Sequence, residues 1–254
     1  MNTLRNKNSN IGPNHHNMRE LENLYATSQF NFLENKVKQL INKYPENTNL
    51  QNILGYTLRA QWKLNEAIEV FAKIIKTQPD YYFAYNNIGN VLKDLCRLDE
   101  AQAYYQKCIE INSKHINAYI GLGQILLDLN KLNESAAVFK QALKIEPNSG
   151  QLHRHLSQVI KYEQTNSHLR DMENIILNSN ATHNQQMHLS FALGKAYEDI
   201  KSYEKAFSYW KRGNFLKKKE IKYSTDYQTR LVQLVKENFT KDLFKKFKNS
   251  GISD

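Results

Sequence analysis

Cysteine, proline and glycine are all scarce in this sequence. Its 254 residues include 2 Cys, 4 Pro and 9 Gly. Two cysteines cannot form a disulfide framework, so a reducing compartment is expected and the protein is predicted to be cytoplasmic. So few prolines and glycines cannot supply the many turns of an all-β fold. Because 41% of the residues are hydrophobic, the chain can still bury a core, which argues against wholesale disorder.

Long apolar runs are also missing. No stretch approaches the roughly 18 consecutive apolar residues that a membrane-spanning helix needs, so no membrane span is expected. The segment 1–17 contains six Asn and no apolar run. Residues 1–17 are therefore predicted to be a disordered N-terminus and not a secretory signal.

The net charge of +10 is concentrated at the C-terminal end. Residues 201–254 carry 14 Lys and Arg against 6 Asp and Glu, so the rest of the chain is nearly neutral. Three interpretations are open for this basic segment. It is a solvated face of a capping helix, a contact for an anionic membrane or nucleic acid, or a surface that docks to a following domain. Docking is favoured over nucleic acid, and no nucleic-acid partner is expected.

A repeat with a constant period organises the middle of the chain. Gly55, Gly89 and Gly123 are spaced 34 apart, and each has a leucine three positions later. The segments that begin at Leu64, Leu98 and Leu132 recur with the same spacing, as do the aromatic residues that follow them, which are Phe71, Tyr105 and Phe139. Such a period is typical of stacked repeats, in which neighbouring units bury the apolar face that one unit cannot cover alone.

This pattern resembles the tetratricopeptide repeat (TPR), a helix–turn–helix unit with the same period. The resemblance predicts an all-α fold, a right-handed TPR helical solenoid. The glycine of each unit is expected to let its first helix approach its second helix closely, because no Cβ atom stands between them. Asn65 and Glu66, with their counterparts in later units, are expected to cap the second helix and to favour its dipole.

The repeats divide the chain into four parts. Residues 1–17 form the disordered N-terminus, and residues 18–149 form the TPR array with clean units at 48–81, 82–115 and 116–149. Residues 150–220 contain a degenerate unit and a final unit, and residues 221–254 are predicted to form a C-terminal basic amphipathic helix. The apolar stripe from Tyr227 to Phe247 supports that helix.

A second, more specific resemblance concerns the end of the chain. The stretch from His188 to Asp199, then Tyr203 to Phe207 and Gly213 to Lys217, is similar to the region that precedes the catalytic domain of bacterial TPR-containing sulfotransferases. This resemblance implies a substrate-recruiting part of an enzyme that uses 3′-phosphoadenylyl sulfate. The Pro-Arg-Ser-Gly-Thr loop that would hold this cofactor is not in the sequence. No cofactor and no catalytic residue are therefore assigned to this chain.

The favoured function is a non-catalytic scaffold that binds a protein or peptide segment in the concave groove of the solenoid. In the TPR family, the first helix of each unit lines this groove. Asn52 and Asn86 are expected to stack as neighbours, where amides can pair with an extended backbone. Asparagine is so common in this sequence that chance alone also places several on any face. The predicted peptide-binding residues are Asn52, Tyr56, Arg59, Asn86, Asn90, Lys93 and Gln124.

Two other kinds of site are not favoured. His153 and His155 are two positions apart, so they point to different faces of a helix and are interpreted as ordinary surface histidines and not as metal ligands. Cys96 and Cys108 are interpreted as buried small hydrophobic residues without a nucleophilic role.

Overall fold

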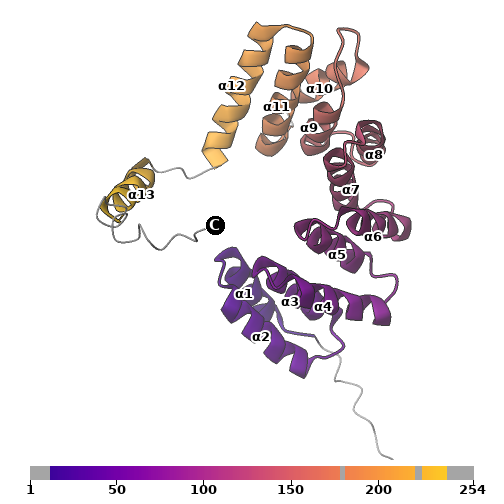
Figure 1. Cartoon of the computed structure of the whole chain (residues 1–254), viewed down its shortest axis with the longest axis vertical. Helices are drawn as coiled ribbons and strands as arrows, with labels where there is room; N and C mark the ends of the chain where they lie inside the picture. The colour runs from indigo at the N-terminus through magenta and orange to yellow at the C-terminus, as the bar shows by residue number, and fades with distance from the viewer. Residues whose placement is uncertain (1–11, 178–180, 221–224, 239–254) are drawn as a thin grey trace, which may run out of the picture.

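A computed structural model describes residues 12–177, 181–220 and 225–238 of the chain (Figure 1). All regular structure in these ranges is helical, and within the first twelve helices each consecutive pair packs closely together except α9 and α10. This confirms the predicted all-α TPR solenoid. The helices are α1 (His15–Ala26), α2 (Phe30–Lys43), α3 (Thr48–Ala60), α4 (Leu64–Thr77), α5 (Tyr82–Asp94), α6 (Leu98–Ile111), α7 (Ile116–Asp128), α8 (Leu132–Ile145), α9 (Gly150–Val159), α10 (Ser167–Leu177), α11 (His183–Asp199), α12 (Tyr203–Glu220) and α13 (Thr225–Asn238).

A single residue reverses the chain inside most helix pairs. It follows the first helix and has a positive φ between 56° and 61°. Four of these residues, Ser28, Trp62, Cys96 and Asn130, recur with the spacing of the sequence repeat. The left-handed conformation is normally taken by Gly or Asn, so Trp62 adopts it at a cost in backbone strain. The same turn explains why Cys96 is exposed, contrary to its interpretation as a buried residue.

The repeat glycines allow the two helices of a unit to pack closely, as the sequence predicts. A Cβ atom on Gly55 would lie 2.4 Å from the ring of Phe71, and one on Gly123 would lie 2.4 Å from the ring of Phe139. Real Cβ atoms do not come this close to other atoms, so any side chain at these positions would displace the aromatic ring. Gly194 and Trp210 repeat this contact between α11 and α12.

Two predictions are wrong, one about a helix cap and one about disorder at the N-terminus. In the unit 48–81, Lys63 occupies the N-cap of the second helix, without a side-chain hydrogen bond, so Asn65 lies inside α4 and does not cap it. At the N-terminus, the Asn14 side chain accepts a hydrogen bond from the Asn17 backbone N–H (2.9 Å) and starts α1. Disorder through residue 17 is therefore incorrect for residues 12–17, while residues 1–11 lie outside the described part.

The fifth helix pair departs from the regular stacking. Helix α9 has 10 residues and ends at Val159, after which Ile160 is extended with ψ of 151°. An irregular segment follows, and α10 begins only at Ser167. Both α9 and α10 pack against α11. The departure opens a pocket on the outer side of the array, between α8, α9 and α10.

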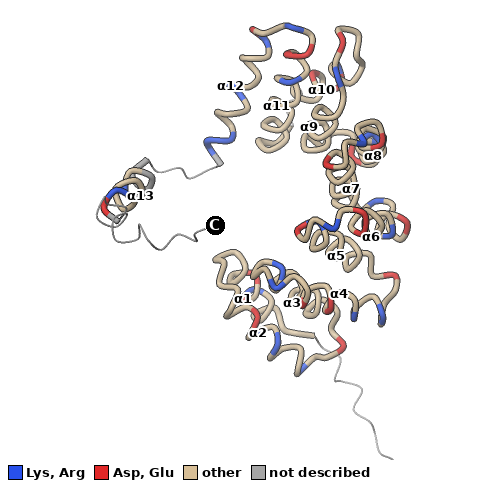
Figure 2. Tube along the Cα trace, viewed as in Figure 1, with Lys and Arg blue, Asp and Glu red and all other residues tan. Residues whose placement is uncertain are grey.

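The C-terminal part is basic in the structure as in the sequence. The last turn of α12 carries Lys217, Lys218 and Lys219, which Figure 2 shows at the end of that helix. Helix α13 covers Thr225–Asn238 of the predicted C-terminal helix, and the remaining residues, 239–254, lie outside the described part. Among the residues that the structure describes, no helix is both long enough and apolar enough to cross a membrane.

Candidate functional site on the inner face

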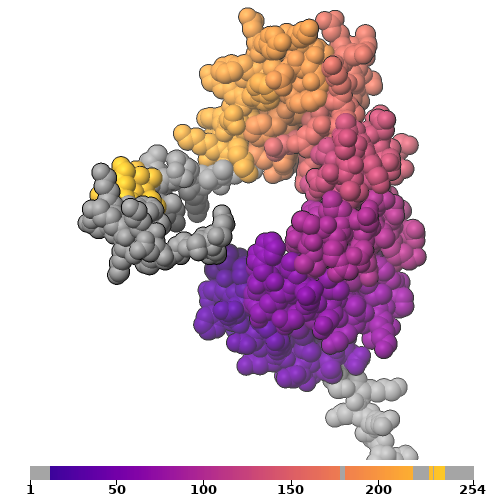
Figure 3. Space-filling view, viewed as in Figure 1, coloured from indigo at the N-terminus to yellow at the C-terminus, as the bar shows by residue number. Residues whose placement is uncertain are grey.

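The helix array curves, and its inner face is formed by the first helix of each pair. Figure 1 shows α3, α5, α7 and α9 toward the inside of the curve, with α4, α6, α8 and α10 behind them. The space-filling view shows that the molecule is hollowed on this side (Figure 3). Side chains on one face of the inner helices therefore meet in a shared concave surface, as the TPR resemblance implies.

One hollow on this surface has a volume of about 610 Å³ and lies between α5, α7, α9 and α11. We call it the polar hollow, because amides, charged groups and imidazoles provide most of its lining. Such a lining can exchange hydrogen bonds with a backbone segment, since it contains both donors and acceptors. The lining residues are Lys93, Asp94, Gln124, Leu127, Asp128, Gln151, Arg154, His155, Gln158 and His188.

Hydrogen bonds across the inner face join side chains of successive units. Arg59 binds Asp94 through two hydrogen bonds, from Nε (2.6 Å) and Nη2 (3.2 Å), and so links α3 to α5. Lys93 Nζ donates to Gln124 Oε1 (3.2 Å) and links α5 to α7. These contacts preorganise the surface, since each fixes a side chain that would otherwise lose rotamer freedom on binding.

The asparagine pairing differs from the predicted one. Asn52 Oδ1 accepts a hydrogen bond from Asn87 Nδ2 (2.8 Å), so Asn52 pairs with Asn87 and not with Asn86. Asn86 is only 6% exposed, and its Oδ1 atom has no hydrogen-bond partner. The prediction that Asn86 lines the groove surface is therefore wrong. The Asn86 side chain points into the packing between helices. Asn87, the next residue of α5, faces Asn52 instead.

The other predicted residues lie on inner helices but differ in their surroundings. Arg59, Lys93 and Gln124 belong to the hydrogen-bonded surface described above. Asn90 accepts a hydrogen bond from the Tyr105 hydroxyl (2.7 Å), which occupies part of its capacity for a ligand. Tyr56 lies further toward the N-terminus, where burial raises its pKa to about 12 and keeps the hydroxyl neutral.

Tyr56 belongs to an apolar pocket between α1 and α3, with a volume of about 370 Å³. Its ring meets the ring of Tyr25 edge-on at a centroid distance of 5.5 Å. Tyr25 is 46% exposed, so the pocket opens to solvent. We call this site the apolar pocket, and its lining residues are Met18, Leu21, Glu22, Tyr25, Ile53 and Tyr56.

Of the residues that line the polar hollow, the sequence predicted Lys93 and Gln124 but none of those on α9 and α11. Arg154 and His188 lie one and two repeat periods after Ile120, in the register that also contains Asn52 and Asn86. Gln158 lies one period after Gln124. Extending the period into the degenerate unit would have found them. The missing glycine and alanine signature of that unit concealed the register.

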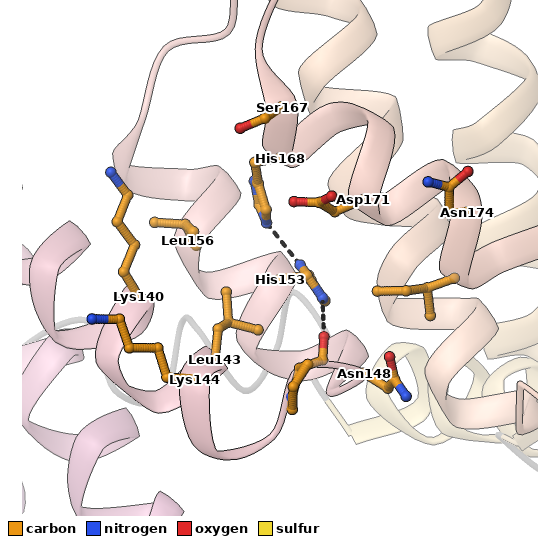
Figure 4. A pocket seen from close by; sticks show the side chains of 12 residues that line it. Lys140, Leu143, Lys144, Asn148, His153, Leu156, Ser167, His168, Asp171 and Asn174 are labelled. Carbon is orange, nitrogen blue, oxygen red and sulfur yellow. Dashed lines mark hydrogen bonds between the residues drawn. The ribbon is translucent and has the colours of Figure 1, made fainter.

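A third cavity lies on the outer side of the array, with a volume of about 500 Å³ (Figure 4). Within it, His153 Nδ1 and His168 Nε2 are 2.7 Å apart, His153 Nε2 is 2.8 Å from the Pro147 carbonyl, and His168 Nδ1 is 2.7 Å from the Tyr162 hydroxyl. His153 is buried, so its interpretation as a surface histidine is wrong. In the described residues no group of three or more His, Cys, Asp or Glu is placed to hold a metal ion.

Known proteins match the chain through its repeats. Residues 80–147 match the family model described as tetratricopeptide repeat. That match does not include the stretch 188–217, so the sulfotransferase resemblance stays a prediction. Among proteins with curated functions, none matches the sequence.

Solved structures, among them two described as TPR proteins, share the fold at low sequence identity. The structure of Pseudomonas aeruginosa pilF aligns with a TM-score of 0.59 and 14% identity, over 86% of this chain and 96% of the other. A thermophilic TPR protein of Thermus thermophilus aligns with a TM-score of 0.55 and 16% identity, over 70% and 97%. YrrB, described as a TPR protein with an unusual peptide-binding site, aligns with a TM-score of 0.51 and 15% identity, over 71% and 91%.

Proposed function

We propose that this protein is a non-catalytic scaffold that binds an extended protein or peptide segment along its inner face. The observation that carries the proposal is the polar hollow, a cavity of about 610 Å³ whose lining comes from four successive inner helices. A segment that runs across the helices would touch several units at once. The TPR fold and the peptide-binding site named for YrrB support this use of the surface.

The lining suits backbone recognition. Gln124, Gln151 and Gln158 each carry an amide that both donates and accepts, so they can pair with peptide N–H and C=O groups in either chain direction. Gln151 and Gln158 are exposed. Binding would therefore rest on shape and hydrogen bonds, with no covalent step.

The proposal is tested by filling the hollow. Gln151→Trp places a large side chain in the polar hollow, and we expect it to abolish most of the binding of peptides selected by the wild-type chain from a random dodecapeptide library displayed on phage. Gln141→Trp, at an exposed position of α8 behind the inner face, is the matched control. Fluorescence polarisation of labelled peptides measures both.

Two outcomes would overturn the proposal. One is that no peptide is enriched on the full chain. The other is that Gln151→Trp and Gln141→Trp bind the selected peptides equally well while both keep the helical circular dichroism of the wild type. Equal binding would place the recognition surface away from the inner face.

A reducing compartment such as the cytoplasm suits the same proposal. Cys96 and Cys108 are both free thiols, and burial raises the pKa of the Cys108 thiol to about 12, which keeps it protonated. Exposed Cys96 would be open to oxidation in an oxidising compartment.

A further inference from the structure

The two ends of the inner face differ in chemistry, and backbone recognition alone does not use this difference. Near the N-terminus lies the apolar pocket between α1 and α3, and near the C-terminus lies the polar hollow between α5 and α11. A ligand that spans both would meet an apolar site at one end and a charged site at the other.

The apolar pocket is suited to one large side chain. Its volume of about 370 Å³ exceeds that of a single aromatic or branched aliphatic side chain, and its walls include Leu21, Ile53 and the edge-on pair of Tyr25 and Tyr56. Burying such a side chain contributes about 1.5–3 kcal/mol. The carboxylate of Glu22 at this pocket disfavours a negative charge on the ligand nearby.

The polar hollow contains two cations, Lys93 and Arg154, that form no salt bridge within the described residues. Lys93 binds Gln124 (3.2 Å), and Arg154 lies 3.5 Å from His188 and 4.7 Å from the ring centroid of Phe191. Within the described residues neither has a carboxylate within 4.0 Å. A cation without an anionic partner in a recess favours an anionic ligand group.

Both cations act on the same point of the hollow. His155 lies in the lining, and its pKa is lowered by burial first and then by the charges of Arg154, His188 and Lys93, while a hydrogen bond with Gln158 acts in the opposite direction. The His155 imidazole is therefore neutral near pH 7, so it adds no positive charge that would bind an anion. Asp128 also lines the hollow and reduces the positive field, whereas Asp94 is neutralised by its bidentate contact with Arg59.

We propose that the bound segment carries a large apolar side chain, which enters the apolar pocket, and an acidic side chain, which binds between Lys93 and Arg154. This inference rests on the proposed peptide-binding function. Neighbouring helices lie about 8–10 Å apart, so the two sites are separated by roughly 20 Å. An extended chain covers that distance in about six residues.

The inference is tested with the selected phage peptides and with a designed decapeptide. The designed probe has Phe at its second position and Glu at its eighth, in a background of Ser and Ala. Three partner probes replace Phe by Ala, Glu by Gln, or both. We expect the first probe to bind at least about tenfold more tightly than either single replacement, because each anchor contributes a side-chain contact.

Variants of the protein assign each anchor to its site. Lys93→Gln and Arg154→Gln are expected to weaken the Glu-containing probe about tenfold and to leave the Gln-containing probe unchanged. Tyr25→Ser is expected to act only on the Phe-containing probes. Lys76→Gln, an exposed position at the end of α4, is the matched control for the loss of one positive charge.

The outcomes separate this inference from the function on which it rests. Recovery of no peptide from the random library would overturn both. Enriched peptides that lack the apolar and acidic pair, or a designed probe that binds no better than its Gln version, would overturn the inference and leave peptide binding in place. Equal weakening of the Glu and Gln probes by Lys93→Gln would also overturn it.

Discussion

Lowering the pH from about 7 to about 5 is expected to destabilise the protein through the histidine pair in the outer cavity. The Pro147 carbonyl can only accept a hydrogen bond, so the neutral His153 donates from Nε2 and accepts at Nδ1. His168 must then donate from Nε2 to His153, and its Nδ1 accepts from the Tyr162 hydroxyl. Protonation of both imidazoles would break this chain, because His153 Nδ1–H and His168 Nε2–H would then face each other.

The surroundings hold both imidazoles in the neutral form. The pKa of His168 is lowered from 6.5 to about 3, first by burial and then by the charges of His153 and Lys140 on neighbouring helices. Burial also lowers the pKa of His153, although the Pro147 contact and Asp171 on α10 act in the opposite direction. Tyr162, whose hydroxyl ends the chain of hydrogen bonds, stays protonated because burial raises its pKa.

The size of the effect follows from proton linkage. Below pH 6.5 the unfolded chain binds a proton at His168 that the folded chain does not, down to the folded pKa of about 3. The contribution of His168 is therefore complete above pH 6.5 and is lost as the pH falls. Between about pH 7 and about pH 5 the loss amounts to about 2 kcal/mol for this one histidine. His153 adds to the loss in the same direction.

Urea unfolding followed by circular dichroism over this pH range measures the effect. Between about pH 7 and about pH 5, the wild type is expected to lose about 2 kcal/mol more of its free energy of unfolding than His168→Gln. The variant has no imidazole to protonate at this position. His16→Gln, at an exposed position of α1, is the matched control. Equal pH dependence in wild type and His168→Gln, or an NMR titration of His168 near pH 6.5 in the folded chain, would refute the reasoning.

Three further substitutions test the packing of the array by urea unfolding. Gly123→Ala is expected to cost about 1–3 kcal/mol because its Cβ would lie 2.4 Å from the Phe139 ring; an unchanged midpoint would contradict the close approach. Trp62→Gly is expected to stabilise by about 1 kcal/mol, since residue 62 is 73% exposed with φ of 60°, and a loss of stability would show that the indole contributes more than the strain costs. Arg59→Met is expected to lower the free energy of unfolding by about 1 kcal/mol at low salt and by less at high salt, because it removes the ion pair to Asp94. An equal loss at both salt concentrations would argue against a contribution of this ion pair.

The repeat determined most of the fold, because its signals are local. A glycine and an aromatic residue 16 positions later, such as Gly55 and Phe71, are part of one unit and can be recognised without knowing what surrounds it. The positive-φ turn left no such signal. Trp62, Cys96 and Asn130 share a conformation and a spacing but no chemistry, so the sequence did not show that Cys96 is exposed there.

The inner face was predictable in position but not in pairing. Arg59, Lys93 and Gln124 follow from the register of the inner helices. The place of Asn86 does not follow from this register, because the rotation of α5 about its own axis decides whether Asn86 or Asn87 faces Asn52. Adjacent helix residues point about 100° apart, so a shift of one position in the register exchanges a surface side chain for a buried one.

The sequence by itself determined an all-α stack of two-helix units, their period and the basic C-terminal end, since these depend on residue type and spacing along the chain. Only the tertiary structure decided which side chains meet across units. The chain of hydrogen bonds from Tyr162 through His168 and His153 joins an irregular segment to two helices, and the polar hollow collects residues from four helices. Contacts of this kind depend on the curvature of the stack and on the break after Val159, and no local pattern encodes either of them.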